Sequence, residues 1–261
     1  MRYFTVIICI VFTLQISVKA KEIYKRNKFN TKYLFYTNAF EINDTIKANK
    51  KLQLLKKSIL PVSLIGAGII MNNSYFEKQL NEDIQTKIHG FSTNIDDYMV
   101  FAPVAEMYIF DIAGVKAKNH WFNQTKYLFI SNVISAGIIY SIKYTSNKAR
   151  PDGTPYSFPS MHTNLAFANA TVLFNEFKQT SPLIAYSGYI FATTTGIFRI
   201  LNNKHYLSDV LAGAGIGILT TELVYYFEPL KKINPFNKSE NISFSPVIYG
   251  NGLGVYFVCR F

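Results

Sequence analysis

Three short stretches hold most of the residues whose types and spacing are suited to chemistry on a phosphate group. They are 143–151 (KYTSNKARP), 158–162 (FPSMH) and 199–209 (RILNNKHYLSD). Hydrolysis of a phosphate ester needs cations to hold anionic oxygens, a nucleophile or activated water, and an acid for the leaving oxygen. Together the three stretches contain side chains of each kind.

The cationic side chains are suited to binding the phosphoryl oxygens. Lys143 and Arg150 are seven residues apart, so on a helix they would share a face. With Arg199 they can neutralise the phosphoryl charge, each charge-assisted hydrogen bond contributing about 1.5–3 kcal/mol, and arginine can bind bidentately. Ser160 and the backbone N–H groups beginning at Met161 form a candidate anion site at a helix start.

Two histidines are the candidates for the nucleophile and the acid. His205 and Asp209 have i, i+4 spacing. A neutral imidazole is a competent nucleophile when a carboxylate holds its other nitrogen, a role that suits Asp209. His162 is then the general acid. An isolated His–Asp pair is more often a structural hydrogen bond, but the joint pattern favours catalysis.

In this order, the three stretches resemble the signature of the type 2 phosphatidic acid phosphatase superfamily, K-x6-RP, PSGH and SR-x5-H-x3-D. This superfamily includes membrane lipid phosphatases, bacterial acid phosphatases and vanadium haloperoxidases. The matching residues are Lys143, Arg150, Pro151, Pro159, Ser160, His162, Arg199, His205 and Asp209.

The resemblance implies an all-helical core that requires no metal or other cofactor. It also implies a phosphohistidine formed at His205 while His162 protonates the leaving group. Met161 stands where the family has Gly, and Phe198 where it has Ser. The gap 151–159 is short for the family, which indicates a trimmed loop. We expect activity with altered substrate shape or rate.

The elements that must position these residues are predicted to be about six helices in a phosphatase domain, 58–227. Several apolar stretches are interrupted by few charges, and hairpin signals are scarce there. A polar, acidic connector, 77–97, separates the first stretch from the next. The glycine run 213–217 resembles a dinucleotide turn, but close helix packing is the favoured interpretation because no strand precedes it.

The flanking segments have other characters. Residues 1–20 have a basic start, an apolar stretch and small residues near Ala20, which predict a signal peptide. A polar, basic lead-in, 21–57, follows it. After the domain come a linker, 228–240, and a tail, 241–261, whose Tyr-Gly-Asn-Gly sequence predicts a β-hairpin.

Composition excludes disordered, collagen and coiled-coil classes, because 49% of the residues are hydrophobic and 16% charged. The net charge of +11 reflects either biased codon usage or attraction to anionic lipids and phosphorylated substrates. No motif for nucleic acid is present. The uncharged stretches 58–76 and 179–198 approach the roughly 20 residues that cross a bilayer, so we expect a helical core partly embedded in a membrane.

These features predict an exported, membrane-associated phosphatase whose site faces the periplasmic or outer side of a bacterial membrane. Its expected partners are the membrane and a phosphorylated lipid: lipid A, phosphatidate, phosphatidylglycerophosphate or polyprenyl diphosphate. Lipid A phosphate is favoured by resemblance to exported bacterial members. The alternatives are a soluble periplasmic acid phosphatase of broad specificity, a vanadate-dependent haloperoxidase and a catalytically inactive membrane scaffold. The oligomeric state stays open.

Overall fold

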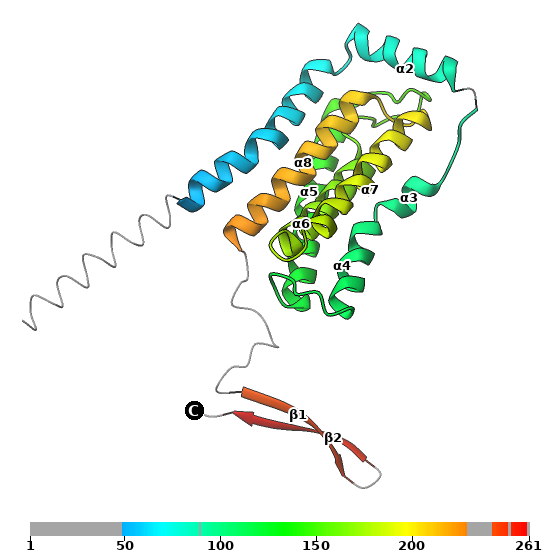
Figure 1. Ribbon diagram of the computed structural model, residues 1–261. Helices are drawn as coiled ribbons and strands as arrows, with labels where there is room; N and C mark the ends of the chain where they lie inside the picture. The colour runs from blue at the N-terminus through cyan, green and yellow to red at the C-terminus, as the bar shows by residue number, and fades with distance from the viewer. Residues whose placement is uncertain (1–48, 89, 229–241, 250–251, 260–261) are drawn as a thin grey trace, which may run out of the picture. The chain divides into compact units, whose positions relative to one another are not determined.

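The computed structural model describes residues 49–88, 90–228, 242–249 and 252–259. The predicted signal peptide, most of the lead-in and nearly all of the linker lie outside these residues. The helices are Asn49–Met71, α2 (Tyr75–Lys87), α3 (Ile95–Met99), α4 (Ala102–Ile112), α5 (Trp121–Ser146), α6 (Met161–Phe177), α7 (Pro182–Leu201) and α8 (Leu207–Phe227), as Figure 1 shows. The all-helical body predicted from the sequence is confirmed.

The helix that contains most of the uncharged stretch 58–76 ends before the end of that stretch. This helix begins at Asn49 and ends at Met71, and Asn73 in the following turn has a φ of 60°. The Ser74 side chain accepts a hydrogen bond from the Glu77 N–H and starts α2, an N-cap that contributes about 1 kcal/mol. The predicted polar connector therefore contains α2 and the short α3, in addition to the predicted helices.

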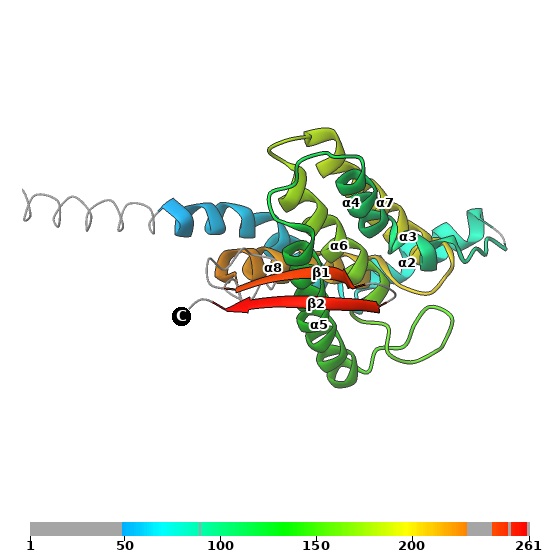
Figure 2. The same cartoon turned by 90° about the horizontal axis from the view of Figure 1, so that it is seen from below.

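Helix α6 lies among α5, α7 and α8 and also packs against α4 (Figures 1 and 2). Two glycines allow α8 to come close to it. A Cβ at Gly213 would lie 2.5 Å from the Ser160 carbonyl oxygen, and one at Gly217 would collide with the Asn164 carbonyl oxygen. The glycine run therefore serves helix packing, and the start of α6 is held against α8 near Asp209.

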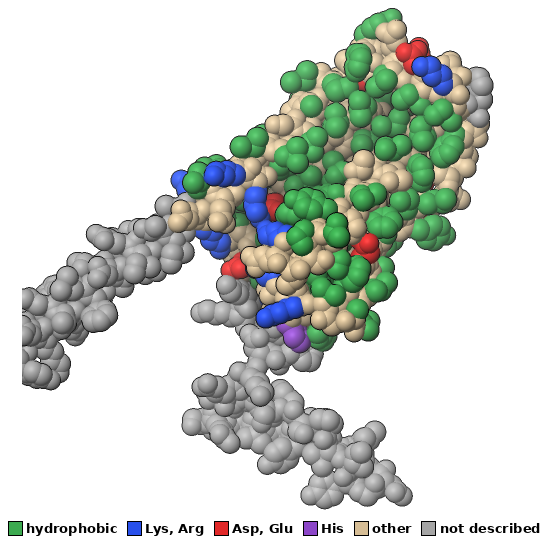
Figure 3. Space-filling model, in the orientation of Figure 1, with side chains coloured by type: hydrophobic (Ala, Val, Ile, Leu, Met, Phe, Trp, Pro, Cys, Tyr) green, Lys and Arg blue, Asp and Glu red, His purple; other side chains and the backbone are tan. Residues whose placement is uncertain are grey.

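Among the described residues, three helices are long and apolar enough to cross a membrane: Asn49–Met71, α5 and α8. Helix α7, which overlaps the stretch 179–198 expected to approach bilayer length, is not among them, and it contains the polar run 193–195 (TTT). Its outer side is nevertheless apolar. Much of the face seen in Figure 3 is hydrophobic, and the strongly exposed α7 side chains on one helix face include Leu183, Tyr186 and Ile190.

The C-terminal tail contains the predicted hairpin. Strands β1 (Ile242–Tyr249) and β2 (Gly252–Cys259) pair antiparallel, with Ile242 opposite Cys259 and Tyr249 opposite Gly252. The register leaves residues 250 and 251 between the strands, in agreement with a two-residue connection.

Candidate active site

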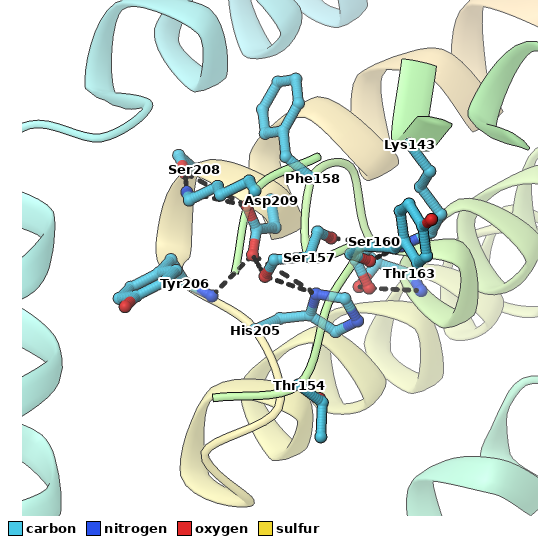
Figure 4. A network of polar contacts seen from close by, with 12 residues as sticks. Lys143, Thr154, Ser157, Phe158, Ser160, Thr163, His205, Tyr206, Ser208 and Asp209 are labelled. Atoms are coloured by element: carbon cyan, nitrogen blue, oxygen red, sulfur yellow. Dashed lines mark hydrogen bonds and ion pairs between the residues drawn. The ribbon is translucent and has the colours of Figure 1, made fainter. Parts of the chain in front are cut away.

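The centre of the site is His205, which is 1% exposed just before α8 (Figure 4). Its Nδ1 lies 3.3 Å from Asp209 Oδ2. The same oxygen accepts a hydrogen bond from the Tyr206 N–H at 2.9 Å, which closes the first turn of α8. The predicted His205–Asp209 contact is therefore present, and Asp209 is held in place because it also caps the start of α8. Since Nδ1 faces the carboxylate, Nε2 is the ring nitrogen turned away from it.

Ser157 is a further member of this centre that the sequence reasoning missed. Its hydroxyl donates to Asp209 Oδ2 and lies 3.5 Å from His205 Nδ1. Its own N–H donates to the Lys148 carbonyl at 2.8 Å. The residue lies in the short gap between the first two motifs. The trimmed loop was the one signal in the sequence that pointed to this segment.

Two of the three predicted phosphate-binding cations, Lys143 and Arg199, lie near His205, and the third, Arg150, lies near Lys143. Lys143 and Arg199 lie close enough to His205 to affect its titration, and Arg150 lies close enough to interact electrostatically with Lys143. Lys143 Nζ donates to the carbonyl oxygens of Tyr156 at 2.6 Å and Ser157 at 3.2 Å. Lys143 therefore also holds the loop beside His205.

Both arginines keep a donor for an anion. Within the described part of the chain, the buried Nε atoms of Arg150 and Arg199 have no hydrogen-bond partner. A buried guanidinium N–H without an acceptor is unfavourable. A phosphoryl oxygen would satisfy these donors and carry the charge that the cations favour.

Ser160 occupies the N-cap of α6, as predicted, but its own groups are engaged within the protein. Its N–H donates to the Asp209 carbonyl at 3.0 Å, and its Oγ accepts from the Thr163 N–H and hydroxyl. The first N–H groups of a helix have no intrahelical acceptor. At this helix start, the donors that remain for an anion are the N–H groups of Met161 and His162.

His162 lies at a more exposed place and is paired with an acid that the sequence reasoning did not assign. Its Nε2 is 2.9 Å from Asp97 Oδ1. Arg199 Nη1 donates to Asp96 Oδ2 at 2.8 Å and lies 3.6 Å from Asp97 Oδ1. Both acids belong to α3, within the stretch read as an acidic connector. Their side chains differ, because that of Asp96 is 1% exposed and that of Asp97 is 52% exposed.

The pKa values of both histidines are lowered, mainly by burial. Burial, with smaller contributions from the Lys143 and Arg199 charges, lowers the pKa of His205 to about 4 against the opposing effect of Asp209. The pKa of His162 is lowered by burial and then by Arg199, while Asp97 and Asp96 raise it. His205 is therefore neutral, as a nucleophile must be, over most of the pH range.

The two departures from the family pattern have different surroundings. Met161 is the first residue of α6 and is half-buried. The Phe198 ring packs against the Phe91 ring, with centroids 5.9 Å apart. Phe198, which stands where the family has Ser, thus contacts the segment that precedes α3.

The described residues contain no group of three His, Cys, Asp or Glu side chains arranged to hold a metal ion. The cations of this site are Lys and Arg side chains. Metal independence stays a prediction.

Comparison with known proteins agrees with the three motifs. The PAP2 superfamily model matches residues 124–233, the segment that contains all three motifs. The chain is 34% identical over 169 residues to lipid A 1-phosphatase of Porphyromonas gingivalis, covering 64% of this chain and 38% of that protein. It is 38% identical over 73 residues to the bacitracin transport permease protein BcrC of Bacillus licheniformis, covering 28% and 34% respectively. The chain thus spans about two fifths or less of these relatives.

Two solved structures are also similar. LpxE of Aquifex aeolicus has a TM-score of 0.42 and 20% identity, covering 56% of this chain and 93% of that one. The transmembrane PAP2-type phosphatidylglycerolphosphate phosphatase of Bacillus subtilis has a TM-score of 0.44 and 18% identity, covering 68% and 98%.

Proposed function

We propose that this chain is a membrane-associated phosphatase that removes a phosphate monoester or a terminal pyrophosphate group from a lipid. One observation carries the proposal: the buried His205–Asp209 pair lies near Lys143 and Arg199, with Arg150 beside Lys143, and the Nε atoms of both arginines have no hydrogen-bond partner among the described residues. This arrangement combines a neutral nucleophile with donors for phosphoryl oxygens.

In the proposed reaction, the phosphoryl oxygens bind Lys143, Arg150 and Arg199. His205 Nε2 attacks phosphorus, and the bond from phosphorus to the leaving oxygen breaks as His162 donates a proton to that oxygen. Water then attacks the phosphohistidine, the P–N bond breaks, and a proton from the water returns to His162. Inorganic phosphate leaves, and His205 is free again. No step requires a metal ion.

A lipid substrate is supported by the apolar surface and by the relatives. In the part of the chain that the structure describes, three helices could cross a bilayer by length and composition. Large apolar side chains are exposed on them, such as Ile70 on Asn49–Met71 and Phe129 on α5. Exposed apolar side chains gathered on such helices are typical of membrane contact. The relative named lipid A 1-phosphatase makes a lipid A phosphate the first substrate to test.

The predicted signal peptide supports a further part of the proposal, that the site faces the periplasmic or outer side of a bacterial membrane. Addition of a membrane-impermeant phosphatase inhibitor to intact spheroplasts tests this orientation. Inhibition without lysis supports an outward-facing site, and inhibition that requires lysis contradicts it.

The test of function is phosphate release by the full-length protein in detergent. The panel contains lipid A, phosphatidate, phosphatidylglycerophosphate, a polyprenyl diphosphate and p-nitrophenyl phosphate, each assayed beside His205→Ala and, as a control, His120→Ala at the N-cap of α5. Release that requires His205 supports the proposal. No release by the wild type, or equal release by both proteins, overturns it. Release from p-nitrophenyl phosphate alone would contradict the lipid substrate.

A further inference from the structure

Lys148 is a buried cation in the stretch 143–151. It occupies a variable position of the K-x6-RP pattern, and the proposed reaction gives it no role. The residue is 5% exposed, and its Nζ donates to Glu77 Oε1 at 2.8 Å, to Asp209 Oδ1 at 3.0 Å and to the Ser208 hydroxyl at 3.0 Å. An ammonium group has three protons, so these three acceptors use its whole donor capacity. Lys148 is thus committed to the protein and is not a fourth phosphate-binding cation.

The Lys148 contact divides the two oxygens of Asp209. Oδ1 accepts from Lys148, while Oδ2 accepts from the Tyr206 N–H and the Ser157 hydroxyl and faces His205 Nδ1. Rotation of the carboxylate would break contacts at both oxygens. The orientation that keeps Oδ2 beside the imidazole therefore depends on what binds Oδ1.

Glu77 supplies the second carboxylate to this cluster, from outside the family segment 124–233. It belongs to the first turn of α2, is 1% exposed, and also accepts from the Asn73 N–H at 2.6 Å. A buried ammonium without charged partners is strongly unfavourable. Glu77 compensates the charge of Lys148, so that Lys148 can stay buried behind Asp209.

We infer that Lys148 and Glu77 are positioning residues of the proposed reaction, which hold Asp209 and through it His205. Glu77 holds the ammonium group, the ammonium group holds Asp209 Oδ1, and Asp209 Oδ2 holds His205 with Nε2 turned away from the carboxylate. A segment that precedes the family match thereby acts on the nucleophile without touching substrate. The inference rests on the proposed function.

A purely structural ion pair that docks α2 onto the body would make a different prediction. Its loss would lower stability, and any effect on turnover would be independent of Asp209. A positioning role requires that the effect of Lys148 pass through Asp209. A double-mutant cycle separates the two roles, because residues that act as a unit have non-additive effects on rate.

The test uses Lys148→Met, Asp209→Asn and the double variant of the full-length protein, assayed with the best lipid substrate of the panel. We expect Lys148→Met to lower kcat by about 10- to 100-fold, the range typical of groups that orient a catalytic ligand, with KM nearly unchanged. In the Asp209→Asn background the same substitution should lower kcat little further. Full additivity, or a rise in KM at constant kcat, would overturn the inference.

Two further variants keep the test decisive if Lys148→Met does not fold. Glu77→Gln retains an oxygen acceptor without the charge and should lower kcat less than Lys148→Met, again only where Asp209 is intact. Gln85→Ala removes a different α2 contact, the hydrogen bond of Gln85 to the Ile200 carbonyl at 3.1 Å. It should leave kcat unchanged, and an equal loss in Gln85→Ala and Glu77→Gln would assign the effect to α2 docking.

The same experiment distinguishes the two proposals. If the wild type released no phosphate, the proposed function would fail, and the positioning role with it. If the wild type released phosphate and needed His205, but the Lys148 and Asp209 effects added, the positioning role alone would fail.

Discussion

The two histidines of the site lie in contrasting surroundings. His205 is almost fully buried, and its partner Asp209 is held by Tyr206, Ser157 and Lys148. The His162 side chain is 36% exposed, and its partner Asp97 is more exposed still. A nucleophile has to be neutral and fixed, whereas an acid has to meet leaving groups and exchange protons with solvent. The difference in burial fits the difference in proposed roles.

The largest expected effect is loss of the buried histidine. His205→Ala should lower kcat by about 10⁴-fold or more, since removal of a nucleophile leaves only the contribution of the binding groups. Phosphate release and acid-labile trapped phosphoenzyme measure the two consequences. Trapped phosphoenzyme in His205→Ala would show that another residue is the nucleophile, and the contrast between the histidines would be wrong.

Loss of the exposed histidine should depend on the leaving group. His162→Ala should lower kcat by about 10²- to 10⁴-fold on alkyl phosphates, the usual contribution of a general acid, and far less on p-nitrophenyl phosphate, which needs no proton to depart. Parallel assays with both substrates measure the ratio. Equal losses would remove His162 from the acid role.

Arg199 is close to both histidines, since its charge lowers the pKa of each. Its substitution should weaken the binding of an anion by an intermediate amount. Arg199→Lys retains a charge for the buried Asp96 but removes the guanidinium fork, so inhibition by vanadate should weaken by about tenfold or more, the equivalent of one charge-assisted hydrogen bond. Lys204→Ala is the control, because Lys204 pairs with Asp152 at the surface. Unchanged inhibition in Arg199→Lys would place the anion elsewhere.

The smallest expected effect concerns pH. Activity requires neutral His205 and protonated His162, so kcat/KM should rise through a pKa of about 4 and fall again through a pKa below 6.5. Asp97 raises the pKa of His162. In Asp97→Asn the falling limb should therefore move to lower pH.

Because exposed ion pairs contribute about 0.2–1 kcal/mol, the rate loss above the optimum should stay below about tenfold. Full pH profiles of the wild type and Asp97→Asn measure this shift, with Asp83→Asn on the exposed side of α2 as the control. A falling limb that does not move would show that Asp97 has no influence on the acid.

Residues that are close in sequence were the predictable part of the site. The His205–Asp209 contact follows from helical spacing, and Ser160 was placed correctly at a helix start. The helical body also followed from long apolar stretches with few charges. Such features depend on local periodicity, which a single sequence displays directly.

The other partners come from segments far apart in the chain. Asp96 and Asp97 reach Arg199 and His162 from α3, and Glu77 reaches Lys148 from α2. An acidic connector has the same composition whether its carboxylates face solvent or a buried cation. The sequence alone therefore does not distinguish a solvent-facing carboxylate from one that pairs with a buried cation.

The sequence by itself determined which side chains are available for the proposed chemistry: a set of Lys, Arg, His and Asp residues suited to a phosphate group, on or next to apolar helices. The tertiary structure decided which of these groups are free to act. Packing of α8 against α6 through Gly213 sets the place of Ser160, and burial makes His205 a weak base while it commits Lys148 to Asp209. Burial and long-range contact are properties of the folded chain, since they depend on which segments exclude water together.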